Sequence, residues 1–255
     1  MANEADDDGT GLPASLAMAW GLRERPGKGP RPTLTLQRIV DAAVALAAAE
    51  GMGVVSMGRV AKELGVSTMS LYRYVTAKEE LYILMADAGV GTPPASSGGS
   101  DAGWRELLSE WAYAQRAVLM ANSWILRIPI TGAPVSPNQL AWMDRGLAAM
   151  AGTALRESEK LSAIILIGGL VRNEATMAAD MMDAIIKSGV SPDQVLGQYL
   201  RTLRLMTGPD THPAVTGLLE SDAFTGSDEP DFQFRFGLGR ILDGLAALIS
   251  ERSTP

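Results

Sequence analysis

The segment from Ser56 to Lys78, SMGRVAKELGVSTMSLYRYVTAK, constrains the fold more than any other part of the chain. It combines a short amphipathic helix, a break at Gly65 and a second short helix. This order is typical of a helix-turn-helix, in which a glycine adopts the positive φ of the turn. Ala61 is small enough for the two helices to approach, and Leu71 is placed to pack inward. The segment therefore predicts two helices that cross at a tight turn.

The second helix of this segment carries an unusual outward face. Ser67 is a suitable N-cap, and Thr76 with Glu79 forms the T-x-x-E pattern of a capping box for the next helix. Most of its outward side chains are hydrogen-bonding or aromatic, and they are Thr68, Met69, Ser70, Tyr72, Arg73 and Tyr74. Such a face fits a DNA groove. Spacing alone also fits a purely structural joint between two short helices.

The residues on both sides of the motif narrow this choice. LYRYV is followed by Thr76, Lys78, Glu79 and Leu81, and an amphipathic helix that ends at Glu50 and Gly51 precedes the motif. From about Leu34 to Met85 the chain resembles the TetR family of one-component transcriptional regulators. The resemblance implies a DNA-binding protein that reads bases from the start of the second motif helix.

Carried over residue by residue, the resemblance gives a set of expected DNA contacts. It implies base contacts for Thr68, Met69 and Tyr72, and phosphate contacts for Ser70, Arg73, Tyr74 and Lys78. The helix starts at Ser67 and Thr76 add backbone N–H groups that favour phosphates, and Ser56 also belongs to the expected set. Tetracycline repressors can also use a long side chain early in the first motif helix, where this chain has Gly58. We therefore expect Arg59, or the arm before the motif, to contribute to base readout.

The uneven charge of the chain agrees with a DNA-binding head. The net charge is −7, but residues 23–85 hold nine bases and six acids, whereas residues 1–22 hold four acids and no base. A local excess of basic residues is the usual electrostatic mark of a nucleic-acid-binding region. The segment RERPGKGPRP cannot be helical because of its prolines. It is either an arm that reaches phosphates or the minor groove, or a solvated linker.

Composition divides the chain into four parts and predicts an all-α fold. Residues 1–33 are expected to form a flexible arm, first acidic and then basic, and residues 34–88 the helix-turn-helix domain. A Gly/Ser/Pro-rich linker covers 89–103. Beyond it, helical periodicity predicts a larger helical domain over 104–255. Its expected helices cover 104–120, 137–151, 158–187, 192–206, 213–219 and 231–250.

Two late helices have the composition of an interface. Residues 161–170, LSAIILIGGL, are apolar or small on every side, and the last helix carries Leu238, Ile241, Leu242, Leu245 and Leu248. Ordinary core packing explains both helices equally well. The family resemblance implies a homodimer built from two such helices of each subunit, with two heads that match a palindromic operator.

The C-terminal stretches HPAVTGLLESDAF and FQFRFGLGRILDGLAALI resemble the tetracycline-repressor-like C-terminal domain. This resemblance implies a cavity for a small, largely apolar effector, whose binding releases the protein from DNA. Large or flexible side chains are the candidates for its lining, namely Trp111, Trp124, Trp142, Met143, Asn173 and Met177. The alternatives are plain core packing for these residues and an ion pair between Arg172 and Glu174.

Other function classes have little support in the sequence. The chain has no cysteine and one histidine, His212, so neither a metal site nor a cofactor is expected. Catalytic motifs with a nucleophile elbow or a phosphate loop are absent, which argues against an enzyme. We find no signal peptide and no apolar run of the roughly 18 residues of a membrane span, and expect a cytoplasmic protein. A DNA-binding regulator without a small ligand is the remaining alternative.

Overall fold

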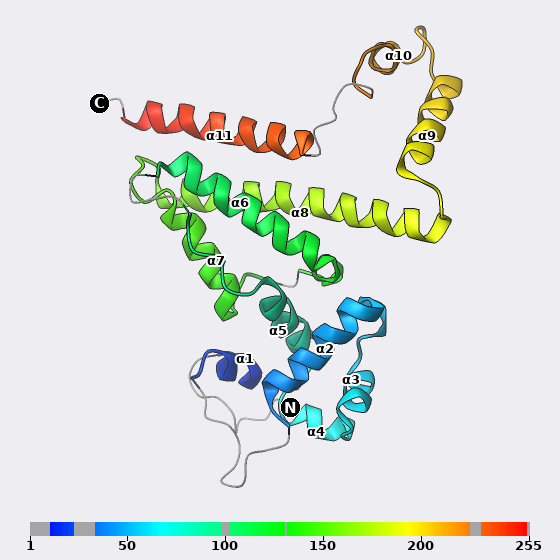
Figure 1. The fold of residues 1–255 in the computed structure, drawn as a ribbon. Coiled ribbons are helices and arrows are strands. Elements are labelled where there is room, and N and C mark those ends of the chain that lie inside the picture. The colour runs from blue at the N-terminus through cyan, green and yellow to red at the C-terminus, as the bar shows by residue number, and fades with distance from the viewer. Residues whose placement is uncertain (1–10, 23–33, 98–101, 131, 225–230, 254–255) are drawn as a thin grey trace.

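The computed structural model describes residues 11–22, 34–97, 102–130, 132–224 and 231–253. Within these ranges all regular structure is helical, and strands are absent (Figure 1). The predicted all-α fold class is thereby confirmed. The acidic first ten residues and the basic segment RERPGKGPRP fall outside the described ranges, so the role expected for that arm stays a prediction.

The N-terminal helical domain, in which we expect the DNA contacts, is built on α2 (Leu36–Glu50), which packs against α3 (Met57–Leu64) and α5 (Lys78–Val90). The short helix η1 (Met52–Val54) connects α2 to α3. Thr35 caps α2, since its hydroxyl accepts from the backbone N–H of Arg38 at 3.2 Å. Ile39, Ala43 and Val60 are fully buried between these helices. The cap of α2 and these three apolar positions therefore follow the local sequence pattern.

The start of α5 differs from the predicted capping box. The side chain of Glu80, not Glu79, accepts from the backbone N–H of Thr76 at 3.2 Å and from its hydroxyl. The helix begins at Lys78, two residues after the expected start, and Ala77 is its N-cap. Glu80 is buried, and the hydroxyl of Ser15 donates to it at 2.6 Å. A carboxylate in the core thus joins α5 to a segment 65 residues earlier.

That earlier segment is α1 (Ala14–Ala19), which lies in the part of the chain where we expected a flexible arm. Ser15, Leu16 and Ala17 are all buried, and α1 contacts α5 (Figure 1). Trp20 follows it and donates from Nε1 to the carbonyl of Val135, at 2.8 Å. Residues 11–22 therefore bridge α5 and the loop before α7 (Pro137–Ala148).

Ser15→Ala tests this bridge. The substitution removes the donor to the Glu80 carboxylate in a buried site, which costs about 1–2 kcal/mol of unfolding free energy. Chemical denaturation should show that loss, whereas Ser109→Ala, whose exposed hydroxyl bonds only within its own helix, should leave stability within about 0.5 kcal/mol. Equal stability of both variants and the unmodified chain would mean that α1 does not hold α5.

The larger domain packs α6 (Trp104–Ala121), α7 and α11 (Phe232–Ser253) around the long helix α8 (Glu157–Ser188). Figure 1 shows α11, α6 and α8 running side by side above the DNA-binding domain. The core contains Leu108, Trp111, Ile167 and Phe234. The leucines expected at an α11 interface, Leu238, Leu242, Leu245 and Leu248, pack into or against this core instead.

Two helices stand away from the core. α9 (Pro192–Met206) and α10 (Pro213–Glu220) contain no buried residue and contact mainly each other. In Figure 1 they project beyond the far end of α8. Their apolar side chains, such as Tyr199 and Met206, are exposed. Because α9 begins with a capping box and a proline at its first turn, its helical form is specified locally rather than by packing.

Candidate nucleic-acid interface and effector cavity

The turn of the helix-turn-helix has the predicted geometry. Gly65 ends α3 with φ 66°, in the left-handed region, and Ser67 caps α4 (Thr68–Tyr72) by accepting from the N–H of Ser70. Leu71 is fully buried and anchors α4 against α3. The opposite side of α4 is therefore left facing solvent.

Several polar groups expected to contact DNA are already engaged inside the domain. The hydroxyl oxygens of Ser67 and Ser70 lie 2.9 Å apart and bond each other. The hydroxyl of Tyr74 donates to the carbonyl of Leu34 at 2.9 Å, and its ring packs against the core. Ser56 caps α3 by accepting from the N–H of Arg59 at 3.2 Å. In the free protein these groups hold α4, the second helix of the helix-turn-helix, in position.

Arg59 is also engaged. Its guanidinium donates to Glu63 and to Glu50, both at 2.7 Å, and these interactions, led by the hydrogen bond to Glu63, raise its pKa. Gly58 beside it has open space where a side chain would lie. A base contact by Arg59 would require its guanidinium to exchange these two carboxylates for DNA, and the expected contact stays a prediction.

Four expected contacts keep exposed side chains. Met69 is 73% exposed and Tyr72 42% exposed, and Arg73 and Lys78 are also exposed. The ammonium of Lys78 lies 5.0 Å from the centre of the Tyr82 ring, which orients it. Thr68, at the first position of α4, is partly exposed. These residues surround the outer side of α4, where the resemblance places base and phosphate contacts.

The DNA-binding domain is connected to the larger domain through the end of α5. A side chain at Gly89 would place its Cβ 2.7 Å from the ring of Trp124 and 2.8 Å from Ile125. Both residues belong to η2 (Ser123–Arg127), a 3₁₀ helix after α6 that the sequence did not reveal. A movement of η2 therefore acts directly on the last turn of α5.

Gly89→Val should separate these two elements. The added side chain cannot fit against Trp124, and overpacking of this kind costs about 1–3 kcal/mol. We expect a lower unfolding temperature and a weaker response of DNA binding to any effector. Gly103→Val is the control, because its Cβ meets no atom within 4 Å. An unchanged unfolding temperature for Gly89→Val would contradict the contact.

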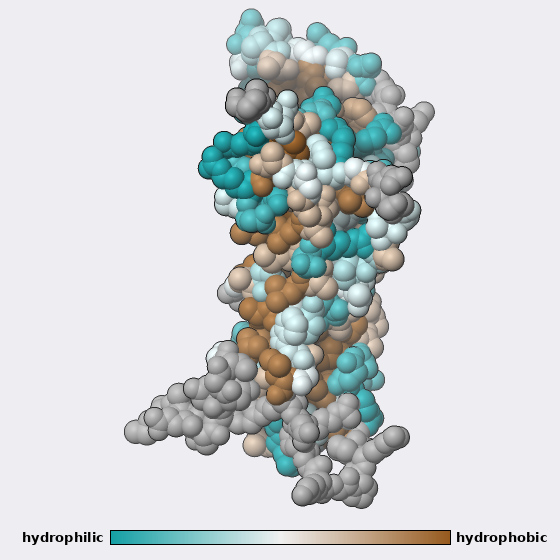
Figure 2. Space-filling view, turned by 90° about the vertical axis from the view of Figure 1, so that its left-hand side faces the viewer, coloured by the Kyte–Doolittle hydropathy of each residue, from teal (hydrophilic) through white to brown (hydrophobic). Residues whose placement is uncertain are grey.

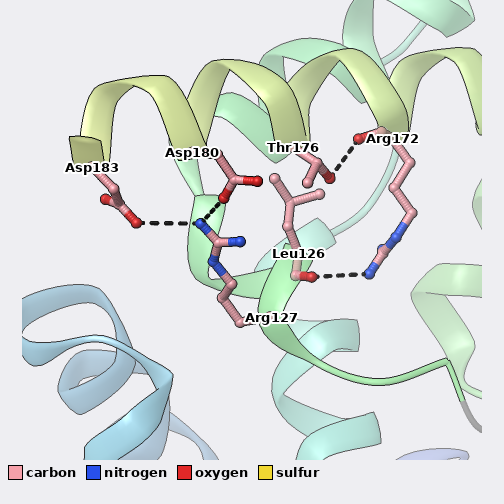
Figure 3. Close-up of polar contacts among 6 residues, drawn as sticks. All are labelled: Leu126, Arg127, Arg172, Thr176, Asp180 and Asp183. Carbon is pink, nitrogen blue, oxygen red and sulfur yellow. Dashed lines mark hydrogen bonds and ion pairs between the residues drawn. The ribbon is translucent and has the colours of Figure 1, made fainter. Parts of the chain in front are cut away.

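Two arginines join η2 to α8 (Figure 3). Arg172 of α8 donates to the carbonyls of Leu126 and Ile128 at 3.3 Å each, and burial lowers its pKa. Arg127 of η2 pairs with Asp180 and, at 3.2 Å, with Asp183. The expected pair of Arg172 with Glu174 is not formed, because Glu174 instead pairs with Arg116 at 2.7 Å.

Of the three predicted tryptophans, Trp111 and Trp142 lie in the core of the larger domain, whereas Trp124 packs into the core of the N-terminal helices. Trp111 donates from Nε1 to the carbonyl of Trp142 at 2.8 Å, and Trp142 donates to the carbonyl of Gly91 at 2.9 Å. Trp142 also borders a hollow of about 200 Å³, together with Val90, Gln115, Val118, Leu119, Pro134 and Gln139. Met143 packs against the core nearby. The lining is mostly apolar, with two amide side chains that sequence reasoning missed.

Asn173 and Met177 lie elsewhere. Both are exposed, and the amide of Asn173 contacts the sulfur of Met177 at 3.7 Å on the outer side of α8. Within one chain the structure therefore does not bring them to the hollow beside Trp142. Trp124, a residue of η2, is buried against α5, and its Nε1 has no hydrogen-bond partner among the described residues. A buried donor of this kind is available to a ligand.

The remaining expectations concern metals and membranes. Among the described residues, no group of three or more acidic or histidine side chains could hold a metal ion. His212 is exposed at the N-cap of α10 and contacts Thr211. α8 has the length and composition of a membrane span, a test that a core helix of a soluble protein also passes. One side of it packs against α6 and α11, as in a globular core.

Family profiles match both domains. The profile of the tetR family of bacterial regulatory proteins matches residues 39–85, and that of the tetracyclin repressor-like C-terminal domain matches residues 97–249. The HTH-type transcriptional repressor DrrR1 of Streptomyces coeruleorubidus is 37% identical over 98% of this chain and 92% of its own length. The repressor Rv1353c of Mycobacterium tuberculosis is 25% identical over 91% of this chain and 87% of its own.

Solved structures agree with these matches. ActR of Streptomyces coelicolor without ligand superimposes with a TM-score of 0.71, at 25% identity, over 88% of this chain and all of its own. ActR in complex with actinorhodin gives a TM-score of 0.66 at 26% identity, over 86% of this chain and 98% of its own. BioQ bound to its double-stranded DNA operator shares the fold, with a TM-score of 0.54 at 19% identity over 84% and 99%.

Proposed function

Because this chain belongs to the TetR family of bacterial transcriptional regulators, we propose that it is a ligand-responsive repressor that binds a palindromic operator as a homodimer. A small, largely apolar effector releases it from DNA. The observation that carries this function is the reading helix α4, anchored by buried Leu71 and presenting Met69 and Tyr72 to solvent.

Repression, rather than another use of DNA binding, is supported by the similarity to DrrR1, a transcriptional repressor. DNA contact by the outer side of α4 is supported by its exposed polar and basic side chains. The cytoplasm is the compartment in which such a protein meets its operator. The chain has no cysteine, which suits a reducing compartment.

The exposed apolar side of α8 supports a homodimer. Ala163, Ile164 and Ile167 are buried in the core, whereas Ile165 and Leu166 are 65% and 57% exposed. Figure 2, in which the left-hand side of Figure 1 faces the viewer, shows hydrophobic residues in a broken column down that side of the molecule. Exposed apolar residues at helical spacing are unusual on a soluble monomer, and a second copy would cover them. Asn173 and Met177 lie further along the same helix and would then face the partner.

α9 and α10 fit the same arrangement. A helix pair with no buried residue gains little by projecting into water, and association with a partner subunit would bury its apolar side chains. Phe232 and Phe236 of α11 are exposed as a stacked pair, with ring centres 6.1 Å apart. We include these aromatic rings in the subunit contact instead of the α11 leucines, which pack into or against the core.

The effector site is supported by the hollow beside Trp142. Its volume of about 200 Å³ is below the roughly 300–1,000 Å³ of ligand pockets, so a ligand of ordinary size must widen it. If a ligand widened the hollow between α6 and α7, η2 would move, and η2 contacts Gly89 of α5. α5 would then transmit the movement to the helix-turn-helix. ActR, a structural relative, has been solved in complex with the small molecule actinorhodin, which supports our proposal of a small-molecule effector for the present chain.

A thermal-shift screen coupled to DNA binding tests the proposal. Hydrophobic metabolites and antibiotics, with actinorhodin as the first probe, should include a compound that raises the unfolding temperature and weakens DNA binding. A mobility-shift titration at fixed salt measures the second effect. Compounds that stabilise the protein without changing DNA affinity would contradict effector control, and a regulator without a small ligand would then be favoured.

A further inference from the structure

Met69 stands apart from the other side chains of the reading helix. It is the second residue of α4 and is 73% exposed, although it is apolar. Leu71, two residues later, is fully buried and supplies the inward anchor of the helix. Met69 therefore has no packing role in the described structure, and its exposure calls for another explanation.

Most polar groups near Met69 are already paired in the free protein, whereas Thr68 is partly exposed and Arg73, which follows α4, is exposed. The Ser67 and Ser70 hydroxyls bond each other, Tyr74 bonds the carbonyl of Leu34, and Arg59 is held by Glu50 and Glu63. Bidentate recognition of guanine or adenine needs free Arg, Lys, Asn or Gln side chains. α4 itself, TMSLY, has none of these. Apolar and aromatic contact is thus the main chemistry left at the start of the helix.

Only one base-pair feature in the major groove is apolar. The C5-methyl group of thymine lies at the groove edge, and side chains read it by van der Waals contact. The first residues of a recognition helix are those that reach base edges. A methionine side chain is unbranched and flexible, so it can adapt to a methyl group there.

We infer that Met69 is a specificity-determining residue that reads the C5-methyl group of a thymine in each operator half-site. This inference rests on the proposed function, since it requires that α4 enters the major groove. It identifies the recognised group as the methyl, so that 5-methylcytosine, which carries the same group, would be accepted in part at that position.

The test begins with a duplex selected by the protein from a random library. Each thymine is then replaced by deoxyuridine, which lacks the methyl but keeps the hydrogen-bonding groups, and Kd is measured by fluorescence anisotropy at fixed salt. Replacing the recognised thymine in one half-site removes one buried methyl contact and should raise Kd about fourfold. Replacing it in both half-sites should raise Kd about fifteenfold. Replacing that deoxyuridine by 5-methylcytosine, paired with guanine, should restore part of the loss.

Three variants decide whether Met69 is responsible. Met69→Ala should bind more weakly and lose the difference between thymine and deoxyuridine at that position. Met69→Gln should instead favour adenine, which glutamine recognises through N6 and N7. Ile130→Ala, with a side chain 74% exposed in the larger domain, should keep the full discrimination.

The outcomes separate the inference from the function. The inference would be overturned if deoxyuridine left Kd unchanged at every thymine, or if its effect on Kd were the same in Met69→Ala. DNA binding itself would stand in both cases. Failure to enrich or bind any duplex would overturn the proposed function itself.

Discussion

Leu166→Glu combined with Ile165→Glu is expected to convert the protein to a monomer and abolish tight operator binding. Both side chains are exposed on the apolar side of α8, and neither is needed for the core of one subunit. Burying each would stabilise an interface by about 1.5–3 kcal/mol, and four added charges across a two-fold interface would repel. Sedimentation equilibrium should then give a mass near that of one 26.9 kDa chain.

Operator affinity should fall when dimerisation is lost. Linking two heads makes the second half-site contact effectively intramolecular, which raises overall affinity by about 10²–10⁴-fold, and the monomer loses this gain. Ile130→Glu is the control, because it adds one glutamate at an isoleucine that is 74% exposed and lies outside α8. A double variant that stays dimeric at micromolar concentration, or binds the operator unchanged, would rule out this interface.

Tyr72→Ala and Lys78→Ala should weaken operator binding without unfolding the chain. Tyr72 is 42% exposed on α4, and its loss should cost about 1–3 kcal/mol per half-site, or about five- to 150-fold in Kd for each half-site. Lys78 is a proposed phosphate contact, so its loss should weaken binding to all sequences. It should also reduce the slope of log Kd against log salt by about 1 per subunit.

The control for Lys78 is Lys187→Ala, which removes the same charge from the last turn of α8 at the other end of the molecule. Circular dichroism and the unfolding temperature confirm that each variant is folded. Unchanged affinity in both Tyr72→Ala and Lys78→Ala would remove the basis for placing DNA against α4.

The sequence predicted the helix-turn-helix well because its signals are local. Gly65, Ser67 and Leu71 each fulfil a steric or capping requirement within a few residues, and the structure has them in those roles. The helices from α6 to α11 were also predicted, since the helical periodicity of their apolar residues can be recognised within each segment. Boundaries moved by a few residues where the first turn was capped differently.

What the sequence did not reveal depends on contacts between distant residues. α1 is only six residues long, and its burial depends on Glu80, which is 65 positions away. Arg59 seemed free for DNA until the fold placed Glu50 beside it. η2 follows α6 closely, and no local pattern distinguishes its 3₁₀ turn from the end of that helix. The hollow beside Trp142, which we propose as the effector site, could not be predicted for the same reason, because its lining comes from α5, α6, α7 and the loop before α7.

The most direct test of the central claim is the stoichiometry and symmetry of the DNA complex. Duplexes selected from a random library by the full chain are sequenced, and the complex is weighed by sedimentation equilibrium. We predict a two-fold symmetric sequence, with half-site centres separated by a whole number of helical turns, and two chains per duplex. Selected sequences without symmetry, bound by one chain per duplex, would contradict the account.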